Sequence, residues 1–151
     1  MPYEEPDTVG GIFILDLKTN QISKVAGSEG MYTPRWSPDG RYINAQTSDS
    51  LKQTLFDFKT RSWQELTSGV NIGFPNWSRD GKYVYYDAGV GDQAGFYRVR
   101  ISDHEVERVV GLKDIRRTGL YFWGGLAGDD SPLLLRDTGT QEIYALDVDL
   151  P

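Results

Sequence analysis

The residue types that most often perform catalysis are sparse in this sequence. His104 is the only histidine, and it stands in the stretch Ser-Asp-His-Glu. A catalytic role would require a nucleophile or a second base held within reach of its imidazole. The stretch aligns with a turn of the internal repeats described below, and turn tips are usually solvated. Neither the Gly-x-Ser-x-Gly motif nor the phosphate-binding Gly-x-Gly-x-x-Gly motif occurs, so we expect no enzyme active site.

Two carboxylate pairs, Asp129-Asp130 and Asp147-x-Asp149, carry the oxygen ligands that calcium and magnesium prefer. Two carboxylates at one place are a weak signal for such a cation. The first pair aligns with a turn of the repeats and the second with a strand near the chain end, so a structural role is favoured for both. We therefore expect no metal and no other cofactor.

The segment 113–123 is the sharpest candidate for a binding surface. It places Arg116 and Arg117 among large apolar and aromatic residues, in a chain that is otherwise acidic. Planar guanidinium groups stack on aromatic rings and bind carboxylates through two hydrogen bonds, so this composition is common at protein interfaces. The alternative is that both arginines only pair with nearby acids while the aromatic residues pack beneath them. Composition alone favours neither interpretation.

The overall composition is that of a globular domain with an acidic surface. The chain has 151 residues, of which 22 are acidic and 16 basic, for a net charge of −6. This balance argues against nucleic-acid binding and favours a role in solubility. There is no apolar run near membrane-spanning length and no leader-like segment, so we expect no contact with a membrane. Because cysteine is absent, its usage gives no guide to the compartment; the cytoplasm is slightly favoured and the periplasm stays open.

The elements that must position these residues come from an internal repeat. The ten residues 34–43, Pro-Arg-Trp-Ser-Pro-Asp-Gly-Arg-Tyr-Ile, are matched by 75–84, Pro-Asn-Trp-Ser-Arg-Asp-Gly-Lys-Tyr-Val, which lie 41 positions later. A degraded third copy runs over 126–133, where Asp130 replaces the turn glycine. Asp-Gly in the first two copies predicts a tight hairpin turn, because glycine accepts the positive φ that such a turn needs.

A second repeated segment supplies another strand of each unit. Its four copies are 12–19, 53–60, 96–103 and 143–150. With the strands on either side, each unit has four, which we call a, b, c and d: strand a ends at the tryptophan, b follows the Asp-Gly turn, c is this second segment, and d follows it. Four-stranded antiparallel units with a period of about 40–45 residues are typical of β-propeller blades.

The fold class we predict is therefore all-β, with about three propeller blades per chain. We expect residues 1–10 to form a linker or a disordered N-terminal segment. We expect 11–151 to form a partial propeller in the strand order c–d, a–b–c–d, a–b–c–d and a–b–c. A closed ring usually needs about four to eight blades, and an uncovered strand edge invites pairing with another chain. We therefore expect either a homodimer with a ring of about six blades or a longer protein that contains this segment.

The repeated phrases around Trp36 and Trp77 resemble the WD40-like β-propeller repeat of TolB-type proteins. The propellers of dipeptidyl peptidase IV are similar. The stretch 53–101 is most similar to the propeller regions of bacterial multidomain regulators, in which such blades follow a DNA-binding or kinase module. The resemblance covers about residues 11–150. It implies a fold and says little about a ligand, because propellers host many functions.

Residues that recur in every unit are expected to be structural. Trp36 and Trp77 occupy equivalent positions, as do Tyr42 and Tyr83, and repetition favours packing between blades over ligand binding. Their turn aspartates are expected to bind nearby backbone N–H groups.

Residues in the variable loops are better candidates for function. In propellers the d–a and b–c connections gather on one face around the central channel, and loops on a rigid scaffold often carry binding residues. Here these loops cover 27–33, 68–74 and 111–122, and 48–52, 88–94 and 137–140. We predict binding residues among these loops and beside the repeated tryptophans: Tyr32, Arg35, Phe74, Asn76, Arg116, Arg117 and Tyr121.

Three functions follow from this pattern. The first is a non-catalytic propeller scaffold, part of a bacterial regulatory or sensory protein, that binds a protein or peptide segment through the d–a face. The second is a sensor that binds a small ligand in the channel, where Arg35 and Asn76 would point. The third, a lactonase or glycosidase of the propeller type, would need clustered channel carboxylates, and strand a supplies none before its turn aspartate.

Overall fold

Every regular element that the structure describes is a β-strand, apart from one short 3-10 helix. The computed structural model describes residues 10–116, 124–140 and 142. Among these residues no helix has the length and apolar character needed to span a membrane. The elements in chain order are β1 (Phe13–Leu15), β2 (Ile22–Lys24), β3 (Met31–Trp36), β4 (Tyr42–Thr47), β5 (Lys52–Asp57), β6 (Ser62–Ser68), β7 (Asn76–Trp77), β8 (Tyr83–Ala88), η1 (Gly91–Gln93), β9 (Gly95–Arg100), β10 (Val106–Gly111), β11 (Gly124–Leu126) and β12 (Pro132–Leu134).

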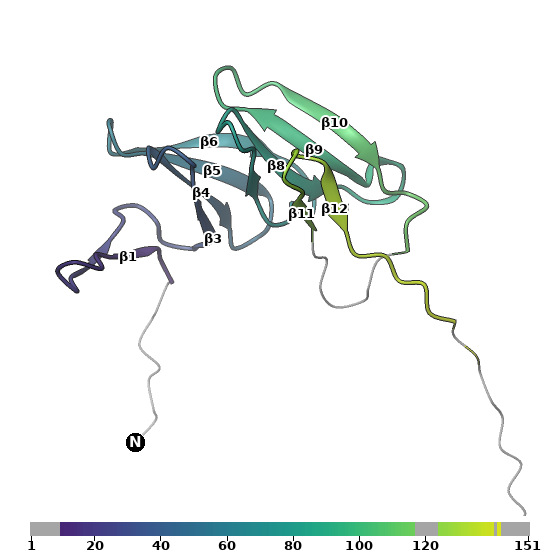
Figure 1. Cartoon of the computed structure of the whole chain (residues 1–151), viewed down its shortest axis with the longest axis horizontal. Coiled ribbons are helices and arrows are strands. Elements are labelled where there is room, and N and C mark those ends of the chain that lie inside the picture. The colour runs from purple at the N-terminus through teal and green to yellow at the C-terminus, as the bar shows by residue number, and fades with distance from the viewer. Residues whose placement is uncertain (1–9, 117–123, 141, 143–151) are drawn as a thin grey trace, which may run out of the picture.

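The strands form four antiparallel sheets that follow one another along the chain (Figure 1). A two-stranded sheet, β1-β2, comes first. Two four-stranded sheets follow, β3-β4-β5-β6 and β7-β8-β9-β10, and a two-stranded sheet, β11-β12, comes last. Each four-stranded sheet has the sequential a–b–c–d order of a propeller blade, and the predicted fold class is confirmed. The predicted final strand c, at 143–150, lies outside the described residues, as do nine of the ten residues of the predicted N-terminal linker.

The core lies between the sheets, because alternate residues of each strand face opposite neighbours. Between the two four-stranded sheets, Leu55 and Leu66 pack with Val84, Tyr86 and Val99. A second cluster joins β1-β2 to the first four-stranded sheet, and a third joins the second four-stranded sheet to β11-β12. Every blade therefore depends on its neighbours for burial.

The Asp-Gly turns have the same hydrogen bonds in both full repeats. Ser37 Oγ donates to Asp39 Oδ1 at 2.6 Å, and the same carboxylate accepts the backbone N–H of Arg41 at 3.0 Å. In the next blade Asp80 Oδ1 accepts from Ser78 Oγ at 2.8 Å and from the N–H of Lys82 at 3.0 Å. The turn glycines have φ of 71° and 70°. The predicted turn geometry, with glycine at a positive φ, is confirmed.

The degraded third copy keeps this turn but shortens it by one residue. Asp130 takes the glycine position with φ of 63°, and Asp129 Oδ1 accepts the N–H of Ser131 at 3.0 Å. The strands then pair Leu126 with Pro132, whereas the preceding repeat pairs Trp77 with Val84. Pro132 has no N–H, so it cannot make the bond that the N–H of Tyr83 makes to Ser78 Oγ at 2.9 Å in the preceding repeat.

Candidate functional site

The predicted d–a and b–c loops lie together at one end of the sheets. Backbone hydrogen bonds join them: Ser48 N–H donates to the carbonyl of Gly30, and Ile72 N–H donates to that of Ser50, both at 2.9 Å. Further along, Gly89 N–H donates to the carbonyl of Val70 at 2.7 Å. We call this end of the molecule the loop face. Its backbone is fixed by main-chain bonds, as a rigid platform for binding residues requires.

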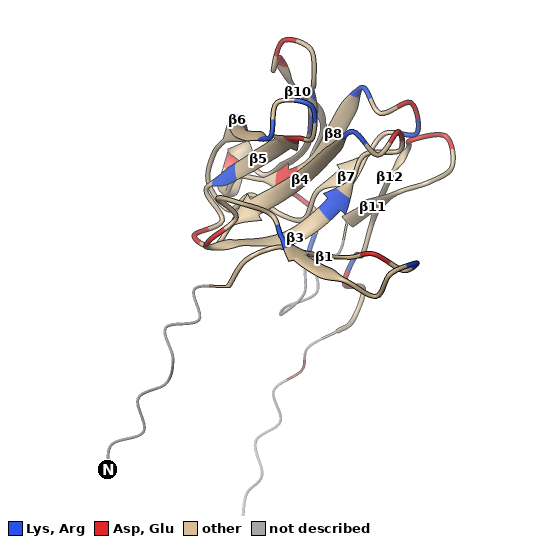
Figure 2. Cartoon of the chain, turned by 90° about the vertical axis from the view of Figure 1, so that its left-hand side faces the viewer, with Lys and Arg blue, Asp and Glu red and all other residues tan. Residues whose placement is uncertain are grey.

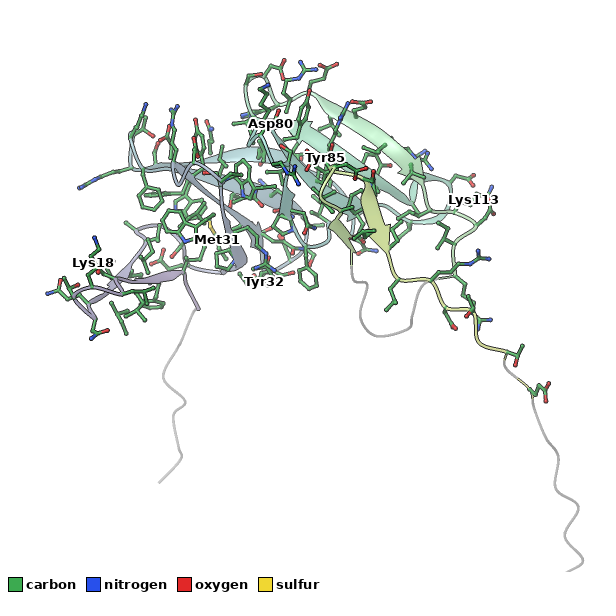
Figure 3. The ribbon with its side chains drawn as sticks, in the orientation of Figure 1. Lys18, Met31, Tyr32, Asp80, Tyr85 and Lys113 are labelled. Atoms are coloured by element: carbon green, nitrogen blue, oxygen red, sulfur yellow. The ribbon has the colours of Figure 1, made fainter. Side chains whose placement is uncertain are left out.

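Tyr32 borders a hollow of about 380 Å³ on this face, together with Gly10, Gly30, Met31 and Ser48. Its hydroxyl is 2.8 Å from Ser50 Oγ, so the ring is attached to the neighbouring b–c loop. Tyr32 and Met31 lie at the start of β3, and Met31 packs on the cluster that joins β1-β2 to the first four-stranded sheet (Figure 3). A half-buried tyrosine in this position offers a ligand one aromatic face and a hydroxyl that already has one partner.

Arg35 and Asn76 occupy matching positions on β3 and β7, which lie side by side, but they differ in what they contact. The Arg35 guanidinium is exposed, and its Nη1 donates to the carbonyl of Pro34 at 3.0 Å. The Asn76 amide is half-buried and donates to the carbonyls of Gly124 at 3.3 Å and Phe74 at 3.2 Å. Asn76 therefore links its blade to β11, whereas most of the Arg35 donors face solvent.

Phe74 is exposed on a d–a loop that is held unusually firmly. Two buried glutamines from the preceding blade donate side-chain N–H bonds to this loop: Gln46 to the carbonyl of Ile72, and Gln53 to that of Gly73, the latter at 2.8 Å. A Cβ at Gly73 would lie 1.9 Å from Asp87 Oδ1, so only glycine fits there. These glutamines do not stand out in the sequence, because alternating polar residues in a strand suggest a face toward solvent.

Arg116 joins a d–a loop to a b–c loop. Its Nε donates to Asp137 Oδ2 at 2.9 Å, and Nη2 donates to the carbonyl of Gly139. The N–H of Gly139 and then this guanidinium lower the pKa of the Asp137 carboxyl. The pairing agrees with the alternative in which the arginine meets a nearby acid, and it leaves the half-exposed guanidinium with further donors. Arg117 and Tyr121 lie outside the described residues.

His104 occupies a recurring turn position. It has φ of 60°, and its N–H donates to the carbonyl of Arg100 at 2.9 Å. Asn20 and Arg61 stand at the equivalent points of the two preceding units, with φ of 56° and 55° and the same bond to the residue four positions earlier. The geometry is a property of the turn. Within the described residues, no three His, Cys, Asp or Glu side chains gather in a way that could hold a metal ion.

Charged residues of both signs are interspersed over the described surface (Figure 2). Many are paired across strands, such as Arg41 with Asp57 at 2.8 Å and Arg98 with Glu107 at 2.6 Å.

Comparison with solved structures shows the β-propeller fold. TolB from Acinetobacter baumannii is similar with a TM-score of 0.63 and 23% identity, over 86% of this chain and 33% of that one. The β-propeller domain of the Trilobed protease from Pyrococcus furiosus, described as having an open velcro topology, gives 0.54 and 19% identity, over 89% and 49%. An oligogalacturonate lyase from Vibrio parahaemolyticus gives 0.54 and 14%, over 66% and 33%.

These similarities establish a TolB-type propeller fold, as the repeated phrases predicted. The chain spans about a third of the length of the TolB structure. The proteins that share this fold include a lyase and prolyl endopeptidases as well as TolB, so the fold does not fix an activity. No protein-family model matches the chain, and no curated protein matches it.

Proposed function

We propose that the chain is a non-catalytic propeller module that binds a protein or peptide segment at its loop face. The observation that carries the proposal is the exposure of Phe74 on a loop fixed by Gln46 and Gln53. An exposed aromatic side chain on a rigid backbone gives up little conformational freedom on binding, which makes it a good anchor. The half-exposed guanidinium of Arg116, on another loop of this face, supplies donors for carboxylates and backbone carbonyls of a partner.

A peptide library displayed on phage and selected against the chain tests the proposal. Calorimetry would then measure the affinity of a selected peptide for the chain and its variants. The double variant Phe74→Ala, Arg116→Ala should bind at least tenfold more weakly, with an almost unchanged melting temperature, because a half-exposed ion pair contributes little to stability. The control is Arg61→Ala, Lys82→Ala, which alters two exposed residues in the turns at the opposite ends of the strands. Equal affinities of both double variants would refute the proposed face.

The propeller ring is completed in this proposal by a second copy of the chain or by further blades. Two observations support it: among the described residues β1 and β12 each pair with a single strand, and Leu15, Leu17 and Ile22 are exposed on the first sheet. Edge strands with exposed apolar residues are prone to pair with other strands. Light scattering coupled to size-exclusion chromatography should show a dimer for the isolated chain. A monomer at all concentrations would exclude the dimer, and further blades in a longer protein would remain as the way to complete the ring.

A small ligand bound beside Tyr32 is the second candidate function, and the hollow of about 380 Å³ favours it. Its volume lies within the range of small-molecule sites, about 300–1,000 Å³. A thermal-shift screen against metabolites should then give hits that Tyr32→Ala abolishes and Tyr32→Phe weakens.

A further inference from the structure

A second cavity opens between the two four-stranded sheets, and two loops of the loop face form part of its rim. Its volume is about 420 Å³. Strands β6, β8, β9 and β10 and the loops that follow β6 and β8 supply its walls. The side chains that define it are Thr67, Val70, Tyr86, Val90, Tyr97 and Val106. The peptide site proposed above does not use these residues.

The aromatic wall of this cavity is formed before any ligand binds. The rings of Tyr86 and Tyr97 are stacked, with centroids 5.9 Å apart and an interplanar angle of 20°. The Tyr86 hydroxyl lies 3.3 Å from Thr67 Oγ1 of the preceding blade, and Tyr97 donates its hydroxyl to the carbonyl of Gln93 at 2.6 Å. Each ring is therefore held at the backbone and at its hydroxyl, so a ligand would lose little free energy to the ordering of these side chains.

A backbone hydrogen bond also fixes the two loops at the rim of this cavity. Gly89 N–H donates to the carbonyl of Val70 at 2.7 Å, which joins the two loops that border the opening. Gly89 has φ of 83°, and a Cβ there would lie 2.3 Å from the carbonyl oxygen of Gln93. Only glycine permits this tight approach.

The chemistry of the lining excludes a charged ligand. None of the lining residues carries a charge, and burying an ion without a partner is costly. Two charged residues that stand close to lining residues in the sequence are already engaged: Arg108 donates to the carbonyl of Ala94 at 3.0 Å, and Asp92 pairs with Lys113 at 2.6 Å. Burial raises the pKa of Tyr86, so its phenol stays neutral near pH 7.

Three valines at the rim remain exposed although they border an apolar cavity. Val70 is 55% exposed, Val90 58% and Val106 46%. Exposed apolar residues grouped around a concave site mark a binding surface. The cavity lies within the size range of small-molecule sites, so it has room for a whole small ligand.

We propose that this cavity binds a small uncharged molecule with a flat ring. The ring stacks against the Tyr86–Tyr97 wall, and the three valines cover its edges. A hydroxyl or amine on the ligand donates to the Tyr97 oxygen, which keeps acceptor capacity after donating its own proton to Gln93.

Calorimetric titration of the whole chain with 2-naphthol tests the site, with naphthalene-2-sulfonate as the charged probe of similar shape. We expect one saturable 2-naphthol site and at least tenfold weaker binding of the sulfonate. Val106→Glu places a carboxylate at the rim and should weaken 2-naphthol binding at least tenfold. Val109→Glu is the matched control on the same strand, since Val109 is 38% exposed and does not line the cavity; its affinity should stay within twofold.

Three results would overturn the proposal: no saturable binding of 2-naphthol up to its solubility, equal binding of the sulfonate, or equal losses in both glutamate variants. Urea unfolding of each variant shows whether the fold is retained. If Val106→Glu proves unfolded, Val90→Glu replaces it, because Val90 lies in an exposed loop at the same rim.

Discussion

Trp36 and Trp77 stand at the same position of two successive blades, yet their surroundings differ. Trp77 is half-buried, stacks on Tyr42 of the preceding blade at 6.4 Å, and donates its indole N–H to the carbonyl of Arg35 at 3.1 Å. Trp36 is 50% exposed and stacks on Phe58 of its own sheet at 5.0 Å. The prediction that both tryptophans pack between blades is therefore confirmed in full only for Trp77.

The difference shows that a repeat position defines a contact only when the neighbouring blade supplies the other half. The counterpart of Tyr42 one repeat earlier would be residue 1, which lies outside the described residues. The described part of the first sheet consists of β1 and β2 alone, the c and d strands of a blade. In an array whose units interact with their nearest neighbours, stability is divided between each blade and its interfaces. Trp77 contributes to the stability of an interface between blades, whereas the stacking contact of Trp36 lies within its own blade.

Replacing each tryptophan with alanine should separate the blade and interface terms. Trp77→Ala removes an inter-blade stack and a hydrogen bond, and we expect it to lower the free energy of unfolding by about 2–3 kcal/mol, below the range for fully buried aromatics. Trp36→Ala should cost about 1 kcal/mol or less, because half of the side chain already contacts water. Urea unfolding followed by circular dichroism measures both.

The comparison would fail if the two alanine variants lost equal stability. Trp77→Phe sharpens it, because phenylalanine keeps a stacking ring but cannot donate to Arg35. This variant should recover most of the loss and leave a deficit of about 1 kcal/mol, the usual net contribution of one hydrogen bond.

The sequence predicted the blades and turns because these depend on local residue types. Asp-Gly specifies a turn wherever it occurs, and alternation in 82–87 and 53–59 specifies strands. It did not predict that Gln46 and Gln53 would be buried, at 2% and 0% exposure. In an isolated sheet such residues would face water, whereas in a propeller the next blade covers that face. Whether a residue on the flank of a blade is buried is thus set by residues far away in the sequence.

For the candidate site, the position of the loops could be predicted from the sequence, but the surroundings of individual residues could not. The gathering of d–a and b–c loops at one end follows from the order of antiparallel strands, and the structure joins these loops by backbone bonds. The different environments of Arg35 and Asn76 could not be predicted, because their positions match. The Asn76 contact depends on the approach of Gly124, and an inserted segment separates that residue from the repeat. The cavity beside Tyr97 was missed for the same reason, since residues of two blades line it.

The shortened turn at Asp130 can also be compared with the turns of the two full repeats, and the expected changes in stability are smaller. Asp130 adopts φ of 63° where the other two copies have glycine, and a non-glycine residue pays about 1 kcal/mol for that conformation. Asp130→Gly should relieve this cost, although the gain is offset in part because Asp130 Oδ1 accepts the N–H of Arg79 at 3.0 Å. We expect a change within about 0.5 kcal/mol. Gly81→Ala, the reciprocal change, should cost about 1 kcal/mol. If Asp130→Gly lowered the free energy of unfolding as much as Gly81→Ala does, the two turns would not be equivalent.

The smallest expected effect concerns the pH dependence of the two full turns. The pKa of Asp39 is lowered by the Ser37 hydroxyl and then by the N–H of Arg41, and the pKa of Asp80 is lowered by the N–H of Lys82 and then by Ser78. A carboxyl whose folded pKa lies below its unfolded value, 3.8 here, stabilises the fold fully above that value. The contribution is lost as the pH falls through the folded pKa.

Stability should therefore decrease with acidification below about pH 4. Asp39→Asn and Asp80→Asn should each make that decrease shallower, because asparagine keeps an acceptor oxygen but does not titrate. Urea unfolding at several pH values between 2 and 6 measures the slopes. The causes are mainly short hydrogen bonds to groups of the same turn, so the two variants should behave alike even though their blades differ in exposure at the tryptophan. A pH effect in only one of them would mean that the turns, like Trp36 and Trp77, are also governed by the neighbouring blade.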